Sequence, residues 1–72
     1  SDFKVKRDNE VYVLEGAGLE RLMQRIDFAN EESVKWFLRV LDDIGAVEAL
    51  RQAGIKNNDT VRVGEYEFEF VE

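Results

Sequence analysis

Cysteine, histidine and proline are all absent from this chain of 72 residues, and methionine and tryptophan occur once each. Without cysteine the chain has no disulfide and no thiolate metal site. Without histidine it lacks the commonest metal ligand and the usual general base of enzymes. A site for Mg²⁺ or Ca²⁺ built from carboxylates alone is the one metal site that the composition leaves open.

Long apolar runs are also absent. No stretch approaches membrane-spanning length and no signal peptide is recognisable, so we expect a cytoplasmic protein that does not enter membranes. The length suits one domain, close to the smallest size at which an apolar core sustains a fold without disulfides or metals. We find no repeat or low-complexity segment, and therefore predict a single domain over residues 1–72.

Acidic residues dominate the charge, with 16 Asp and Glu against 10 Lys and Arg and a formal net charge of −6. A broad phosphate-binding face needs clustered basic residues, so we do not expect direct nucleic-acid binding. The acidic balance is compatible with solubility alone and with a basic protein partner met by charge complementarity. Composition does not decide between these two readings.

Both ends of the chain have the pattern of a β-hairpin. Apolar and charged residues alternate over 3–6, which is typical of a half-buried strand. Residues 11–14 are apolar on both faces and therefore suit the inside of a sheet. Near the end, valines alternate over 60–63, and Gly64-Glu65 then forms a two-residue turn. The last strand, over 66–70, places its aromatic residues on one face and its glutamates on the other.

Three helices are predicted between the two hairpins, each with a single apolar stripe. Asn30 is a favoured N-cap for the second helix, and Gly45 and Gly54 supply left-handed residues that end the second and third. Ile55 is placed to complete a Schellman-type end. The residues expected to face inward are Leu19, Leu22, Met23 and Ile26 on the first helix, Val34, Phe37, Leu38, Leu41 and Ile44 on the second, and Val47 and Leu50 on the third.

The element order β-β-α-α-α-β-β predicts an α+β fold, a two-layer sandwich in which three helices cover one face of a four-stranded sheet. The exposed sides of the outer strands carry opposite charges, lysines over 4–6 and glutamates over 67–69. Opposite charges on neighbouring strands attract by about 0.2–1 kcal/mol per pair. On this basis we expect the first and last strands to lie side by side.

No catalytic arrangement is recognisable. The carboxylate pairs are Glu31/Glu32, Asp42/Asp43 and Glu67/Glu69. Adjacent residues on a helix point about 100° apart, so neither of the first two pairs shares a site. Glu67 and Glu69 share one face of a strand, but an exposed one, and all three pairs are read as solvated surface. The Gly16-Ala17-Gly18 segment lacks the Lys and Ser/Thr of a phosphate-binding loop. There is no plausible activated nucleophile. We therefore expect this segment to be no enzyme and to hold no cofactor or metal.

Two like-charged basic pairs occur at helical i, i+4 spacing, Arg21 with Arg25 and Lys35 with Arg39. Such pairs are mildly unfavourable in an isolated helix, which hints at a partner, but Arg39 can also pair with Asp43 as ordinary surface. Trp36 points away from the predicted apolar stripe, so a neighbouring helix covers it or it is exposed beside Arg39 as an interface anchor. We take Lys35, Trp36 and Arg39 as the candidate partner surface.

Several spaced motifs together resemble the C-terminal domain of the Obg family of bacterial GTPases, over residues 3–72. The motifs are Leu19-Glu20-Arg21-Leu22, the junction Asp27-Phe28-x-Asn30, the helix end from Gly45 to Gly54 with Ala49-Leu50-Arg51, Asp59-Thr60-Val61-Arg62-Val63-Gly64, and Phe68-x-Phe70. At position 36 the family pattern has a basic or polar residue where this chain has tryptophan.

The resemblance implies that the chain is one piece of a larger GTPase, with GTP and Mg²⁺ held by a domain outside this segment. It also implies a part in large ribosomal subunit assembly and in stress and growth control. Within such a protein the segment is expected to be an accessory regulatory or protein-interaction domain, monomeric when isolated, whose partners are proteins such as those of the large subunit or of stress regulation. The alternative is a module that senses a small molecule bound between helices and sheet.

Overall fold

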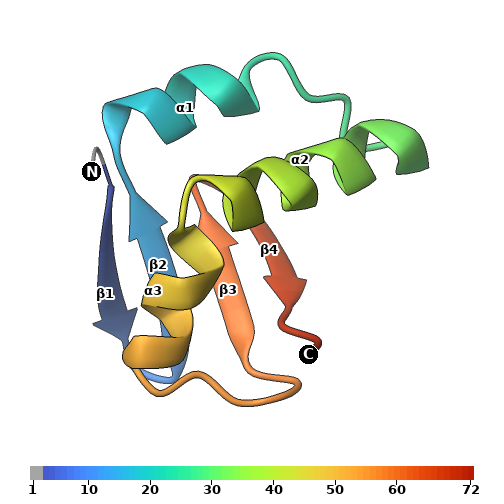
Figure 1. Cartoon of the computed structure of the whole chain (residues 1–72). Helices are drawn as coiled ribbons and strands as arrows, with labels where there is room; N and C mark the ends of the chain where they lie inside the picture. Colours follow the sequence, from blue (N-terminus) through green and yellow to red (C-terminus); the bar gives the residue numbers. More distant parts are fainter. Residues whose placement is uncertain (1–2) are drawn as a thin grey trace.

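The computed structural model describes residues 3–72, and residues 1–2 of the predicted domain lie outside that range. A four-stranded mixed sheet is covered on one face by three helices, which confirms the predicted α+β class and element order. In Figure 1, α2 and α3 lie across the sheet, and α1 lies above the end at which β2 finishes. The elements are β1 (Lys4–Asp8), β2 (Val11–Glu15), α1 (Ala17–Met23), α2 (Glu31–Asp43), α3 (Ala46–Gln52), β3 (Thr60–Val63) and β4 (Tyr66–Glu69).

The strands lie in the order β1-β2-β3-β4. β2 is therefore internal, as its apolar residues on both faces predicted. β1 pairs with β2 and β3 pairs with β4 in antiparallel hairpins, whereas β2 and β3 are parallel, with Tyr12 opposite Val61 and Leu14 opposite Val63. The chain reaches β3 only by crossing over through the helices, because parallel neighbours cannot be joined by a tight turn.

The expectation that the first and last strands are neighbours was wrong, since β1 and β4 form opposite edges of the sheet. Their charges find partners closer at hand. The Lys6 ammonium lies 3.1 Å from a carboxylate oxygen of Glu15, on the neighbouring strand. Glu67 is bound by Arg62, directly opposite on β3, at 3.4 Å. Charge complementarity between two strands therefore did not decide their order.

Arg62 links three strands across the uncovered face of the sheet. Its guanidinium donates to Asp8 at 2.6 Å and to Glu67 at 3.4 Å. The hydrogen bond to Asp8, and the charges of Asp8 and Glu67, raise the pKa of Arg62 above its usual value despite partial desolvation. The guanidinium therefore remains charged, and it ties the β1–β2 hairpin to the β3–β4 hairpin.

Both hairpins use two-residue turns that need a left-handed residue. Asn9 has φ of 56° between β1 and β2, and Gly64 has φ of 61° between β3 and β4. Asparagine and glycine tolerate this conformation best. The turn at Gly64-Glu65 is as predicted, with the positive φ at its first position only.

The predicted helix ends are confirmed. The Asn30 side chain accepts a hydrogen bond from the Ser33 backbone N–H at 3.0 Å and caps α2. Gly45 is left-handed, with φ of 92°, and separates α2 from α3. At the end of α3 the backbone N–H of Ile55 donates to the Leu50 carbonyl at 3.1 Å, and Gly54 N–H donates to Arg51 at 3.0 Å. This pair of bonds is the Schellman motif.

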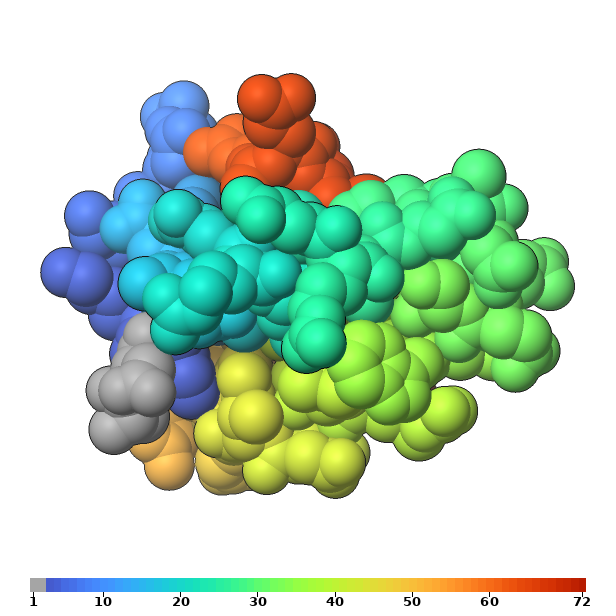
Figure 2. Space-filling view, turned by 90° about the horizontal axis from the view of Figure 1, so that it is seen from above, coloured from blue at the N-terminus to red at the C-terminus, as the bar shows by residue number. Residues whose placement is uncertain are grey.

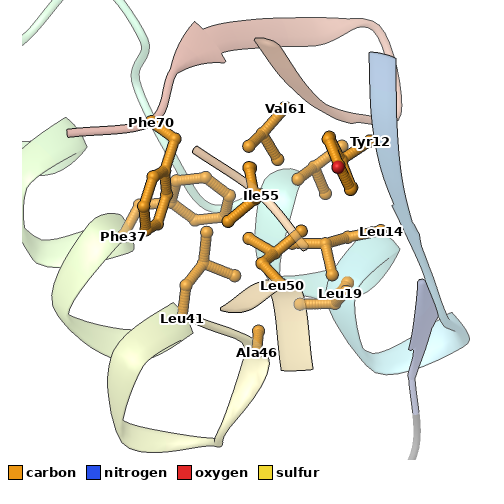
Figure 3. Close-up of a cluster of buried hydrophobic side chains, with 11 residues drawn as sticks. Tyr12, Leu14, Leu19, Phe37, Leu41, Ala46, Leu50, Ile55, Val61 and Phe70 are labelled. Carbon is orange, nitrogen blue, oxygen red and sulfur yellow. The ribbon is translucent and has the colours of Figure 1, made fainter. Parts of the chain in front are cut away.

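A single apolar core fills the space between sheet and helices, and Figure 3 shows its side chains converging from α2, α3 and the strands. Phe37 and Leu41, on α2, are 0% and 1% exposed. The full set is Tyr12, Leu14, Leu19, Phe37, Leu41, Ala46, Leu50, Ile55, Val61, Val63 and Phe70. Of the aromatic residues predicted to face inward at the last strand, Phe70 is buried, and Tyr66 and Phe68 are half-buried against this core.

The buried face of α2 is narrower than the apolar stripe that the sequence predicts for this helix. Val34 is half-buried, but Leu38 is 37% exposed and Ile44 is 44% exposed. At about 100° per residue, Leu38 lies at one flank of the face centred on Phe37 and Leu41. Ile44 is the C-cap, where the chain turns at Gly45 toward α3. The prediction that both are buried was therefore wrong.

Truncation of Phe37 or Leu41 to alanine is expected to destabilise the fold by about 2–5 kcal/mol, because each leaves a cavity in the closed core. Urea denaturation followed by circular dichroism measures the change. Leu38→Ala is the matched control on the same helix, and it should cost much less because Leu38 is already in contact with solvent. An unchanged denaturation midpoint for Phe37→Ala would contradict this assignment of the core.

Candidate interaction surface

The candidate surface of Lys35, Trp36 and Arg39 lies on the exposed side of α2. Trp36 is 43% exposed, so a neighbouring helix does not cover it. Lys35 lies 3.8 Å from Glu32, one turn before it. Arg39 forms no ion pair within residues 3–72, and the expected pair with Asp43 is not formed. All three side chains are exposed, and their role as a partner surface stays a prediction.

The structure also has a groove that sequence reasoning did not find. It runs between α1 and the C-terminal half of α2, has a volume of about 870 Å³ and is open to solvent. Figure 2 looks down on α1, in cyan and teal, beside the yellow-green end of α2. We call this feature the α1–α2 groove. Its apolar lining is Phe3, Leu19, Leu22, Val40 and Ile44, and its polar lining includes Arg21, Gln24 and Arg25.

The linker between the two helices fixes how they are arranged. The Asp27 backbone N–H donates to Ser33 Oγ at 3.0 Å, and Asp27 Oδ1 accepts from the Ala29 N–H at 3.0 Å. Phe28 turns inward, and its ring stacks on Tyr66 with centroids 4.1 Å apart and meets Phe37 edge-on at 5.7 Å. The junction therefore has a structural role, because it attaches the linker both to the start of α2 and to the β3–β4 hairpin.

Trp36 does not line the groove but lies in the same helical row as two residues that do. Residues four apart on a helix lie on the same face, so Trp36, Val40 and Ile44 form one row along α2. Val40 and Ile44 line the groove directly. The four-residue spacing of this row is visible in the sequence, but the apolar stripe predicted Ile44 in the core, and Val40 belonged to no predicted site. Leu38 lies on the opposite flank of the helix.

The basic pair Arg21 and Arg25 lies on the wall of the groove formed by α1 and the turn that follows it. Neither arginine has a carboxylate partner in the described part of the chain. Lys35 and Arg39 are not among the residues that line the groove. The structure thus separates the two basic pairs and places only the first in the groove.

Elements of other kinds of site are not found in the part of the chain that the structure describes. Over residues 3–72 there is no cluster of three acidic side chains that could hold a metal ion. No polar or charged residue is buried there. None of the helices has the length and apolar character needed to cross a membrane.

These features define a small α+β domain with its own closed core and an open apolar groove. A family model described as "Domain of unknown function (DUF1967)" matches residues 3–70. The chain belongs to this family, which is the C-terminal domain of the Obg proteins.

Relatives named GTPase Obg match almost the whole chain. It is 48% identical over 71 residues to the protein of Bacillus licheniformis, with 97% of the chain covered. It is 44% identical over 71 residues to that of Finegoldia magna, with 99% covered. It is 51% identical over 65 residues to that of Shouchella clausii, with 90% covered. The chain spans only 17%, 17% and 15% of these three relatives.

The exposure of Trp36 predicts its fluorescence. Because Trp36 is the only tryptophan, the native domain should emit at long wavelength and be readily quenched by acrylamide. The measurement compares the quenching constant in buffer with that in denaturant, where the indole is fully accessible. A blue-shifted emission that acrylamide hardly quenches would contradict the exposed position of this side chain.

Proposed function

We propose that this domain is an accessory protein-interaction and regulatory domain of an Obg-like GTPase. The observation that supports it best is the combination of a closed core, with no buried charged group among residues 3–72, and an open groove that joins apolar side chains to two arginines without a carboxylate partner in that range. Such a surface suits association with another protein, whereas it offers no group placed for covalent or acid-base chemistry. Family membership supplies the GTPase context.

In this proposal GTP and Mg²⁺ are held by another domain of the longer protein. The Gly16-Ala17-Gly18 segment begins α1 with Gly16 as the N-cap, and no Lys or Ser/Thr follows at the spacing of a phosphate-binding loop. The contribution of residues 3–72 is therefore to bind a partner or to modulate the GTPase, and not to hydrolyse nucleotide.

The partner we propose is a protein component of large ribosomal subunit assembly or of stress and growth control, in the cytoplasm. These assignments follow the family to which the chain belongs. Direct contact with RNA is the less favoured mode, because the net charge is −6 and Trp36 is the single exposed aromatic of the candidate surface.

The alternative function, sensing of a small molecule bound between helices and sheet, has little support in the core of the domain. A ligand bound between helices and sheet needs polar groups that converge on a cavity. Over residues 3–72 the core side chains are apolar except for the hydroxyl of Tyr12, which already accepts a hydrogen bond from Arg7 at 3.0 Å. The concave feature lies outside the core, between α1 and α2, where a partner can reach it.

The isolated domain is expected to bind no GTP. Isothermal titration calorimetry with GTP and Mg²⁺ should give no heat beyond dilution, because the phosphate-cradling loop and its lysine are missing. A longer protein that includes the GTPase domain is the positive control. Micromolar binding to the domain alone would refute the assignment of nucleotide chemistry to another domain.

A deletion tests the proposed role directly. In a full-length Obg protein that contains this domain, removal of residues 3–72 should leave nucleotide binding intact and reduce co-sedimentation with purified large ribosomal subunits. Phe37→Ala is the companion variant, since unfolding the domain in place should mimic its removal. If retention on the subunit is unaffected by the deletion, the domain has no part in that association and the proposed role fails.

A further inference from the structure

The α1–α2 groove is continued along α2 by an exposed aromatic side chain. Val40 and Ile44 line the groove, and with Trp36, one turn before Val40, they form a row of about 12 Å at 1.5 Å per residue. Leu22 and Phe3 contribute apolar surface from the other wall. A helix bound in such a groove presents apolar residues at i, i+4 and i+7 to the rows on either side.

The two arginines give the groove its charge preference. Four basic residues of the described chain form ion pairs with its own carboxylates, namely Lys6, Lys35, Arg51 and Arg62. Arg21 and Arg25 find no such partner in residues 3–72, although the chain has more acidic than basic residues. A guanidinium matches the geometry of a carboxylate and can bind it through two parallel hydrogen bonds.

The net charge of −6 does not cancel this local preference. At physiological ionic strength the Debye length is about 8 Å, so distant charges are largely screened. Glu67 and Glu69 alternate with the core-facing residues of β4 and lie on the uncovered face of the sheet, on the far side from the helices. Among the described residues, the charged side chains that line the groove are Arg21 and Arg25.

We propose that the α1–α2 groove binds an acidic amphipathic helix of a partner protein. The apolar side chains of that helix would pack along Trp36, Val40 and Ile44, and its carboxylates would bind Arg21 and Arg25. This inference rests on the proposed function and specifies its partner surface. It also assigns the exposed Trp36 to one end of the surface that the helix would contact.

A charge-swap experiment tests the inference. The probe is a fluorescein-labelled amphipathic peptide of about four helical turns, without tryptophan, with leucines at i, i+4 and i+7 and flanking glutamates. A second peptide has lysine in place of every glutamate. Wild-type domain should bind the glutamate peptide, and the Arg21→Glu/Arg25→Glu double variant should bind it at least about tenfold more weakly while gaining affinity for the lysine peptide. Fluorescence anisotropy measures both.

Two further variants locate the binding surface. Val40→Asp should abolish binding of the glutamate peptide, whereas Leu38→Asp, an exposed leucine on the opposite flank of α2, should not change it. Circular dichroism verifies that each variant is folded. Arg21 and Arg25 are both exposed, so replacing them leaves the core intact. Binding should also shift the Trp36 emission toward the blue.

The inference is overturned if the wild-type domain does not bind the glutamate peptide, if the double variant binds it equally well, or if a single-stranded RNA of similar length binds the groove in its place. These failures differ from failure of the proposed function. If the peptide does not bind but deletion of residues 3–72 still weakens retention on large ribosomal subunits, only the groove assignment is lost. If the deletion has no effect, the accessory role itself is lost.

Discussion

The parallel pairing of β2 with β3 is the constraint on which the rest of this fold depends. Two antiparallel hairpins could form independently, but joining them in parallel obliges the chain between Glu15 and Thr60 to cross over the sheet. The three helices are that crossover, so they cover one face and leave the other to charged residues. The core lies between this crossover and the sheet, where Phe37 and Leu41 of α2 belong to the same buried cluster as Val61, Val63 and Phe70.

Local features of this fold were predictable from sequence because their causes are local. A cap such as Asn30, a left-handed residue such as Gly45 and an alternating strand act within a few residues of themselves. Strand order was not predictable in this way. The charges of Lys6 and Glu67 can be satisfied on any neighbouring strand, and the structure pairs them with Glu15 and Arg62. An attraction of about 0.2–1 kcal/mol per charge pair cannot outweigh the free energy gained by covering an apolar face of the sheet.

The candidate site was predictable only in part. The position of Trp36 away from the apolar stripe and the like-charged pair Arg21 and Arg25 are both visible in the sequence. The sequence does not show how close Trp36 lies to the two arginines, because this depends on the distance between α1 and α2. Ile44 was misplaced for a related reason. A helical stripe gives the direction of a side chain, whereas burial also requires a neighbour in that direction, and beyond Gly45 the chain turns away.

The stacking of Phe28 on Tyr66 has a consequence for how this surface could communicate. One end of the linker that carries α1 is held by an aromatic contact with the hairpin at the far edge of the sheet, while α1 itself forms a wall of the groove. The end of α1 also lies next to this hairpin, since the Met23 side chain is close to Gly64 in its turn. The α1 wall of the groove therefore rests on the β3–β4 hairpin both directly and through the linker, so the position of that wall depends on the packing of residues far away in the sequence.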